Sequence, residues 1–377
     1  MHLDRTFAAL AVGAVVLAAA WPPQHFLQAQ AASTTKMPVF EVDRTWPKLP
    51  NGWVLGHVPS VAIDRDDHIW VLHRPRTVPE NQRAQAAPPV LEFDAAGAFL
   101  RAWGGPGAGY DWPDSEHGIS VDYRGNVWIG GSSPTSQSLT RRSDDMLLKF
   151  TSAGKFLLQL GGPDKSGGNK DTRSVNKAAD AFVYSKTNEL FVADGYFNHR
   201  VIVFDANSGK YKRHWGAYGK PPDDNYKFPA RAELLKAPPA PQFHNPVHSV
   251  VVSNDDLVYV ADRTNNRFQV FRLDGTFVKE IFIARNTLQA EGTVHHFVLS
   301  PDKAQQFLYL VDGSNKVVRI LNRQTLEILA NLGGHAGHNA REFFHIHSAA
   351  VDSKGNLYLG EVNNGQRYYR YAVRGLK

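Results

Sequence analysis

The chain has 377 residues, of which 42% are apolar and 21% charged, and it contains no cysteine. This composition allows a large apolar core, built either as roughly two domains or as one repeat fold. The formal net charge is +6, but Lys and Arg are interspersed with Asp and Glu, which argues against a basic stripe that binds nucleic acid. The absence of cysteine excludes disulfides and a lipid-attachment thiol.

The N-terminal segment has the pattern of a secretory signal peptide. Arg5 precedes an apolar run, Phe7–Trp21, which is shorter than the roughly 20 residues that cross a bilayer. Small residues follow, so we expect residues 1–31 to be removed by cleavage near Ala31. The mature chain, 32–377, is then expected to be secreted or periplasmic in a bacterium, with no stable membrane insertion. An uncleaved N-terminal anchor is the alternative.

Six segments repeat one pattern of short apolar strands and tight polar turns. They begin near residues 59, 117, 179, 248, 295 and 347. Strands rich in Val, Ile, Phe and Tyr with Asp, Asn and Gly turns indicate antiparallel β-structure. Four strands per repeat predict an all-β fold, a six-bladed β-propeller forming a single domain. The last repeat has three clear strands, and "PVFEVD" at Pro38–Asp43 is predicted to supply the fourth and close the ring.

The long connections all fall on one predicted face. The turns inside each hairpin are short, whereas 74–89, 130–145, 161–178 and 217–247 are long. The face that carries the long loops also carries the start of each blade. Because functional residues concentrate on such loops, we expect the site there.

Histidine is frequent at the first position of the repeats. The six residues are Pro59, His117, Ala179, His248, His295 and His347. His117, His248 and His347 come from alternate blades, so they are predicted to converge on the axis as a three-imidazole zinc site. Copper, nickel and iron also suit imidazole ligands.

The alternative for these histidines is a capping role, in which each ring bonds the backbone of a neighbouring blade. His295 is left out of the predicted site, and His296 is expected to point away from the axis. His335, His338 and His345, in the loop before the last repeat, are expected to be mostly solvated.

Three further residues follow the second strand of a blade on the same face. Arg74, Tyr196 and Arg263 are predicted to lean over the axis. Two guanidiniums can hold a carboxylate, and a phenol near a metal and two cations can act as a general base. The alternative is that the tyrosine packs on a loop and the arginines pair with Asp194 or Asp262. Arg200 and Arg267 occupy the same position before the third strand of their repeats, so they are assigned a structural role in the repeat.

"NHRV" at Asn198–Val201 and the surrounding "VADG…RVIVFD" resemble the NHL repeat family of propellers. At the level of the site, the chain resembles peptidyl-α-hydroxyglycine α-amidating lyases. The resemblance implies that His117, His248 and His347 bind zinc, that Tyr196 is the catalytic base, and that Arg74 and Arg263 attend the substrate. It also implies a calcium site made by the carbonyls of Val61 and Ile119 and by an Asp directly after the third histidine. That residue is Ser348 here, so the chain departs from the family pattern.

The resemblance implies a lyase that splits an N–C bond to give an amide and glyoxylate. Its substrate is expected to be a peptide or small molecule with a carboxylate, and the protein is expected to be a monomer. Two alternatives are kept: a non-catalytic NHL propeller that binds a ligand or protein, and a propeller hydrolase of the lactonase type. The latter class uses carboxylate-rich metal sites, and the first positions of these repeats offer histidine instead.

Overall fold

Six antiparallel sheets of four strands make up the chain as described by a computed structural model, which covers residues 36–377 except 137 and 235. The predicted signal peptide, 1–31, lies outside the described residues. Helical structure within the described part is limited to one turn of α-helix, α1 (Arg231–Leu234), and short 3-10 segments, η1 (Pro75–Thr77), η2 (Glu80–Gln85) and η3 (Ala217–Gly219). Among these residues no helix has the length and apolar character needed to cross a membrane.

Each sheet is one blade of a propeller, and the six-bladed fold predicted from the repeats is confirmed. Blade one contains β2 (Ser60–Ile63), β3 (Ile69–Leu72), β4 (Val90–Phe93) and β5 (Phe99–Trp103); blade two contains β6 (Glu116–Val121), β7 (Val127–Gly131), β8 (Met146–Phe150) and β9 (Phe156–Gly161). Blade three contains β10 (Ala178–Tyr184), β11 (Glu189–Asp194), β12 (Arg200–Asp205) and β13 (Tyr211–Trp215); blade four contains β14 (Val247–Val252), β15 (Leu257–Asp262), β16 (Arg267–Arg272) and β17 (Phe277–Phe282). Blade five contains β18 (His296–Leu299), β19 (Phe307–Asp312), β20 (Val317–Asn322) and β21 (Ile328–Gly333); blade six contains β22 (Ile346–Val351), β23 (Leu357–Glu361), β24 (Tyr368–Leu376) and β1 (Pro38–Asp43).

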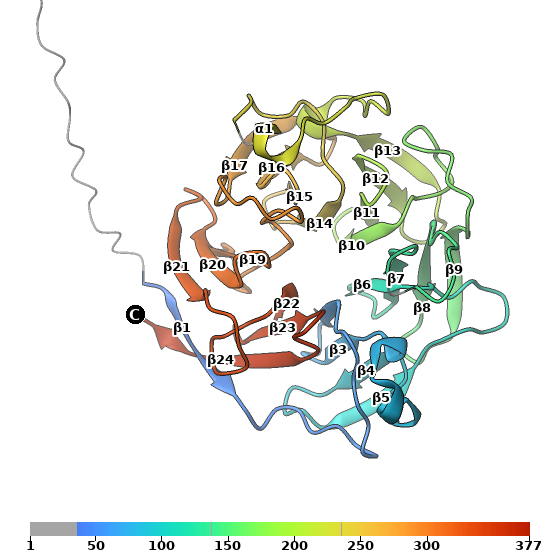
Figure 1. The fold of residues 1–377 in the computed structure, drawn as a ribbon, viewed down its shortest axis with the longest axis vertical. Helices are drawn as coiled ribbons and strands as arrows, with labels where there is room; N and C mark the ends of the chain where they lie inside the picture. Colours follow the sequence, from blue (N-terminus) through green and yellow to red (C-terminus); the bar gives the residue numbers. More distant parts are fainter. Residues whose placement is uncertain (1–35, 137, 235) are drawn as a thin grey trace, which may run out of the picture. The chain divides into compact units, whose positions relative to one another are not determined.

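The first strand of every blade lines the axis. Strands β2, β6, β10, β14, β18 and β22 contact one another in this order, and β22 contacts β2 to complete the circle (Figure 1). Large apolar side chains fill the spaces between adjacent sheets; Trp128 of blade two, for example, packs in a cluster with Phe204 of blade three. Burying such rings between sheets is the main favourable term for a fold without disulfides.

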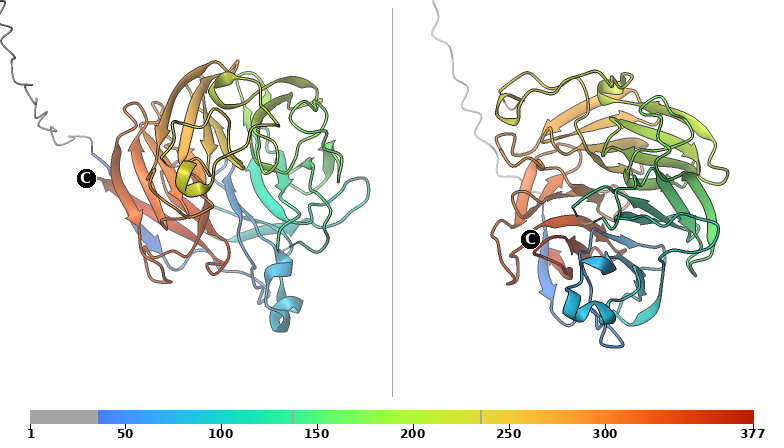
Figure 2. Two further views of the ribbon diagram at one scale, coloured as in Figure 1. Left: turned by 45° about the horizontal axis from the view of Figure 1, so that its top comes forward. Right: turned by 45° about the vertical axis from the view of Figure 1, so that its right-hand side comes forward.

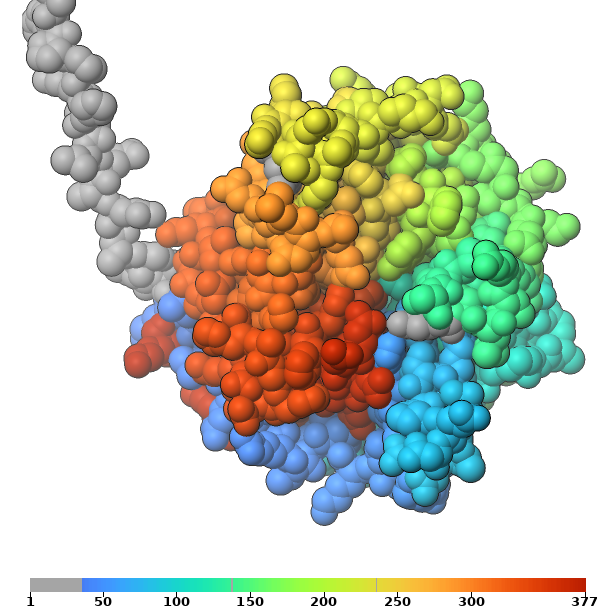
Figure 3. Space-filling model, in the orientation of Figure 1, coloured from blue at the N-terminus to red at the C-terminus, as the bar shows by residue number. Residues whose placement is uncertain are grey.

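The ring is closed by strands that are far apart in sequence. β1 pairs antiparallel with β24, with Phe40 opposite Val373 and Val42 opposite Tyr371. Met37 and Lys377 exchange backbone hydrogen bonds of 2.8 Å beyond the end of this ladder. In the space-filling view, the blue residues of β1 lie against the red residues of blade six (Figure 3).

The connections are unequal at the two ends of the axis. Hairpin turns such as the one between β2 and β3 span only a few residues, whereas the β3–β4 and β7–β8 connections and the links into β10 and β14 are long. These long connections meet the end of the axis at which the inner strands begin. Figure 2 shows η1 and η2 of the β3–β4 connection, in light blue, standing out from the ring.

Candidate metal centre on the propeller axis

Three histidines meet at the start of the inner strands. His117, His248 and His347 are buried, and one ligand atom of each lies within 4.8 Å of those of the other two. Their ring centroids are separated by 4.7–5.0 Å. Since each comes from an alternate blade, the arrangement is the approximate threefold one predicted from the repeat alignment. Burial lowers the pKa of all three imidazoles well below the ordinary value, so the cluster is neutral and able to bind a cation.

Backbone carbonyls fix the protonation of these rings. Nδ1 of His117 lies 2.8 Å from the carbonyl of Ala179, and Nδ1 of His347 lies 2.6 Å from that of Pro59. Nδ1 of His248 lies 2.5 Å from the carbonyl of His295. A carbonyl can only accept, so each Nδ1 carries the hydrogen and each Nε2 keeps its lone pair. The backbone contact considered as an alternative to metal binding is thus present, and it is compatible with metal binding through Nε2.

Glycine follows His117 because the next blade approaches closely. A Cβ at Gly118 would lie 2.5 Å from the carbonyl oxygen of Ala179, the same oxygen that accepts the hydrogen bond of His117. In the "HG" pair, the absence of a side chain at Gly118 therefore allows the Ala179 carbonyl to approach and orient the ring of His117.

Tyr196 extends over the triad from the end of β11. Its hydroxyl lies 2.7 Å from Nε2 of His117 and 3.3 Å from Nε2 of His248. Gly195 allows this position, because a Cβ there would lie 2.1 Å from the backbone nitrogen of Val247, and Asn245 Nδ2 donates to the Tyr196 carbonyl at 2.9 Å. Burial raises the pKa of Tyr196, although the charges of Arg263 and Arg74 act in the opposite direction.

Arg74 and Arg263 flank the tyrosine. Arg74 is buried, donates from Nε to the Glu116 carbonyl at 2.7 Å, and has its pKa lowered to about 10 by burial. Cζ of Arg263 lies 5.8 Å from the ring centroid of Tyr196, and its buried Nε has no hydrogen-bond partner among the described residues. The structure therefore brings together the six residues predicted for the metal and substrate site, whereas Val61 and Ile119, predicted for calcium, lie elsewhere on the axis.

A second group of metal-ligand type lies beside the triad. Nε2 of His345 and of His295 are 3.1 Å and 3.7 Å from the Glu291 carboxylate. Nδ1 of His295 lies 3.2 Å from the Gly313 N–H, which can only donate, and 3.4 Å from the Thr293 carbonyl. The shorter contact and the Glu291 carboxylate beside Nε2 favour the hydrogen on Nε2, in contrast to the triad. Of the three histidines expected to be mostly solvated, His335 and His338 are exposed, whereas His345 is largely buried in this group.

A third group, Asp64, His68 and Glu92, belongs to blade one at the opposite end of the inner strands. His68 Nδ1 contacts Glu92 at 2.8 Å, and Arg101 Nε pairs with the same carboxylate at 2.7 Å. Trp70 Nε1 donates to Asp64 at 3.0 Å. These carboxylates already have hydrogen-bond and ion-pair partners. The three groups found among the described residues thus differ in chemistry, and the triad is the group that offers three imidazole lone pairs.

The residues matched to a calcium site do not fit that ion. Val61 and Ile119 lie on inner strands further along the axis, and the Ile119 carbonyl is 3.4 Å from the Ser60 hydroxyl. Ser348 offers a neutral, buried hydroxyl in place of a carboxylate. Calcium affinity depends on the number of charged oxygen ligands, so Val61, Ile119 and Ser348 form a poor calcium site.

His296 occupies this part of the axis, and the expectation that it points away was wrong. Its Nε2 lies 3.5 Å from the Asp180 carboxylate of blade three, while Ala349 N–H of blade six lies 3.4 Å from its Nδ1. The inner strand has no neighbouring strand on its axial edge, so both of its faces can direct side chains into the channel.

Fold and site together define a six-bladed β-propeller with a histidine triad of metal-ligand type on its axis. The NHL repeat model matches residues 247–271, which cover β14, β15 and most of β16. The chain is similar to NHL repeat-containing protein 3 from Mus musculus, with 29% identity over 244 residues, or 63% of this chain and 58% of that protein. The match therefore spans less than two thirds of that relative's length.

Two further relatives carry enzyme names. The chain is 28% identical over 243 residues to peptidylglycine alpha-amidating monooxygenase from Rattus norvegicus, covering 60% of this chain but 22% of that protein. It is 24% identical over 255 residues to the probable peptidyl-alpha-hydroxyglycine alpha-amidating lyase from Caenorhabditis elegans, covering 62% of this chain and 61% of that protein. The chain is thus a six-bladed propeller with an NHL repeat match in blade four, and it is similar at low identity to proteins named as amidating enzymes.

Two polar groups near the axis, Asp180 and Glu291, are not indicated by the repeat pattern of the sequence. Asp180 lies in β10 and Glu291 in the connection between β17 and β18, and neither recurs at equivalent positions of the other repeats, so the repeat alignment does not identify them. Asp180 directly follows Ala179 at the start of its repeat. An acidic residue inside an otherwise apolar inner strand was the one sign of its role.

Proposed function

We propose that this protein is a metal-dependent carbon–nitrogen lyase that cleaves α-hydroxyglycine-extended peptides or amides to an amide and glyoxylate. The observation that carries the proposal is the position of the Tyr196 hydroxyl, 2.7 Å from Nε2 of His117 and 3.3 Å from Nε2 of His248. A proton acceptor thus lies beside two prepared ligand atoms. The enzyme names among the relatives are consistent with this reaction.

The triad suits zinc. Three neutral imidazoles that keep an open position are the ligand set of catalytic zinc sites, and each ring here is oriented by a carbonyl in the way such ligands require. When bound, zinc supplies a Lewis acid that makes a substrate hydroxyl easier to deprotonate.

Tyr196 takes the hydroxyl proton in this proposal. Without a metal, burial raises the pKa of Tyr196 more than the charges of Arg263 and Arg74 lower it. The phenol therefore stays protonated and donates to Nε2 of His117. A metal would use the same Nε2 lone pair, so metal binding and this hydrogen bond exclude one another. Loss of that acceptor, together with a nearby dication, favours the phenolate that a general base requires.

Arg74 and Arg263 hold the substrate carboxylate and keep negative charge near Tyr196. The O–H electron pair forms the new carbonyl of glyoxylate, the C–N bond breaks, and the nitrogen receives a proton to become the amide. Atoms and electrons balance without an oxidant or reductant. The second candidate is a non-catalytic NHL propeller that binds a protein or small ligand, and it agrees with the relative that is named only for its NHL repeats.

The test is incubation of purified protein with a peptide that ends in α-hydroxyglycine, followed by assay of glyoxylate. Turnover that falls about 100-fold or more in Tyr196→Phe, with zinc content unchanged, supports the proposal. His335→Ala, in an exposed loop, is the matched control. Zinc binding without any glyoxylate would favour the non-catalytic candidate.

A further inference from the structure

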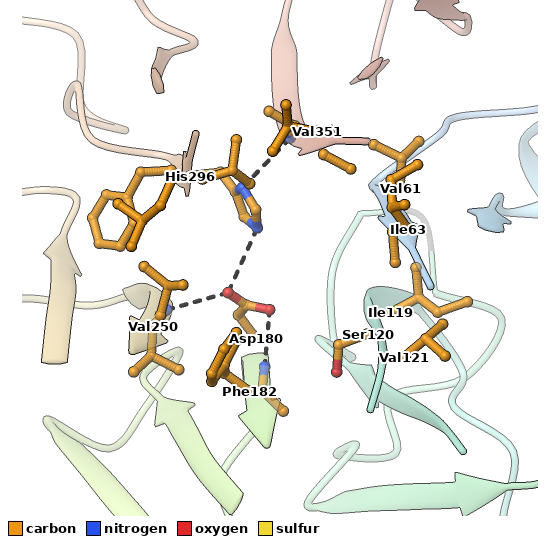
Figure 4. Close-up of a pocket in the computed structure, with 18 of the residues that line it drawn as sticks. Val61, Ile63, Ile119, Ser120, Val121, Asp180, Phe182, Val250, His296 and Val351 are labelled. Atoms are coloured by element: carbon orange, nitrogen blue, oxygen red, sulfur yellow. Dashed lines mark hydrogen bonds and ion pairs between the residues drawn. The ribbon is translucent and has the colours of Figure 1, made fainter. Parts of the chain in front are cut away.

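A second layer of polar contacts crosses the axis directly beyond the histidine triad. It is centred on a cavity of about 250 Å³ lined by the inner strands (Figure 4). Asp180 of blade three accepts from the Ser249 hydroxyl at 2.8 Å and from the Val250 N–H at 3.2 Å, both in blade four. Its other carboxylate oxygen accepts from the Ala181 N–H at 2.9 Å. Both carboxylate oxygens are therefore satisfied by protein donors.

His296 extends this network to blades five and six. The Ala349 N–H donates to its Nδ1 at 3.4 Å, which places the ring hydrogen on Nε2, and Nε2 faces Asp180 at 3.5 Å. Four blades are thus connected across the channel by one carboxylate and one imidazole. We call Asp180, Ser249 and His296 the axial brace.

Each member of the axial brace directly follows, in sequence, a triad histidine or a residue whose carbonyl orients one. Asp180 follows Ala179, whose carbonyl accepts from His117, and His296 follows His295, whose carbonyl accepts from His248. Ser249 follows His248 itself. A shift of the brace would therefore move a triad ligand or the carbonyl that orients it.

We propose that the axial brace takes the place of a structural calcium ion and positions the zinc-binding triad. The positions that calcium would use carry neutral oxygens at Val61, Ile119 and Ser348, while the one acidic side chain lining this cavity, Asp180, is already occupied by donors. Interactions that orient metal ligands typically change metal affinity by about 10- to 100-fold when removed. Asp180 and His296 are therefore positioning residues whose loss weakens zinc binding.

Zinc affinity, measured by competition with a chelator, tests this role in Asp180→Asn and His296→Phe. Asparagine turns an amide N–H₂ toward the donors of Ser249, Val250 or Ala181, so we expect an affinity about tenfold or more below the wild type. His296→Gln keeps a donor and an acceptor and is expected to restore most of the affinity. Val203→Ala, buried in β12 of the same blade as Asp180, is the control for general destabilisation.

Calcium provides a second readout. The wild-type protein is expected to contain no stoichiometric calcium and to keep its melting temperature when excess EGTA is replaced by millimolar calcium. One equivalent of calcium that raises the melting temperature would overturn the proposal, as would brace variants that bind zinc no worse than Val203→Ala. Absence of glyoxylate formation with normal zinc binding would reject only the lyase activity, so the two failures are distinguishable.

Discussion

Arg267 donates from Nε to Asp262 at 2.7 Å, and both side chains are fully buried. Asn265 Nδ2 donates to the same carboxylate oxygen at 2.8 Å, and the His244 N–H donates to the other at 2.9 Å. The carboxylate next to Arg263 is thus already satisfied within the blade. This leaves the Arg263 guanidinium beside Tyr196, and the suggested pairing of Arg263 with Asp262 is wrong.

The first prediction concerns Arg263→Gln. If Arg263 holds the substrate carboxylate, its loss removes a charge-assisted interaction of about 1.5–3 kcal/mol, so KM should rise about 10- to 100-fold with a smaller change in kcat. Steady-state glyoxylate assays with an α-hydroxyglycine peptide measure both constants. Arg272→Gln, at an exposed position of β16, should behave as the wild type. An unchanged KM in Arg263→Gln would remove this residue from the binding site.

The second prediction separates the two histidine groups. His117→Ala, His248→Ala and His347→Ala should each lose most of the bound zinc, because only three ligands are present. His295→Gln should keep it, since His295 Nε2 is a donor and not a ligand. Elemental analysis after dialysis gives the zinc content. A second zinc ion per wild-type chain that is lost in His295→Gln would show that the Glu291 group binds metal as well.

The third prediction concerns Gly118→Ala. The added methyl group would meet the Ala179 carbonyl at 2.5 Å, and backbone must move to relieve this contact. We expect a loss of about 1–3 kcal/mol in the free energy of unfolding and weaker zinc binding, because that carbonyl orients His117. Urea denaturation and chelator competition measure the two effects. As a control, Gly125→Ala lies in an open hairpin turn, where the cost is one of backbone conformation and zinc affinity should be unchanged.

The fourth prediction is a pH dependence of stability from His73. This buried ring accepts from the Gly56 N–H at Nδ1 and donates from Nε2 to the carbonyls of Ala87 and Pro88, and burial lowers its pKa to about 4. The unfolded chain binds the proton below about pH 6.5, whereas the folded chain does so only near pH 4. Stability should therefore fall with decreasing pH between these values, by up to about 1.4 kcal/mol per pH unit from this group.

Urea denaturation at several pH values measures that dependence, and His73→Leu is the informative variant. It should be less stable at neutral pH, but its stability should fall less steeply between pH 6.5 and 4. Other buried histidines contribute to the total slope, so the comparison is the difference between variant and wild type. Equal slopes in the two proteins would contradict the assignment.

The features found from sequence are those that the repeats reveal. Alignment of six copies predicts the blades and identifies His117, His248 and His347, because their positions are defined relative to a shared frame. The roles of Asp180 and His296 depend on a contact across the axis between blades three and five. The repeat pattern of the sequence does not predict contacts of this kind. The tautomer of His295 likewise depends on the Gly313 N–H, 18 residues away in sequence.

The pairing of β1 with β24 has a consequence for the order of assembly. Blade six holds His347, and its sheet is complete only when residues 38–43 meet residues 368–376. Contacts across such a long stretch of chain form late, because loop closure must precede them. The triad requires blades two, four and six to be assembled, so we expect zinc to bind only after the ring has closed. Bound zinc would then stabilise the closed ring against opening.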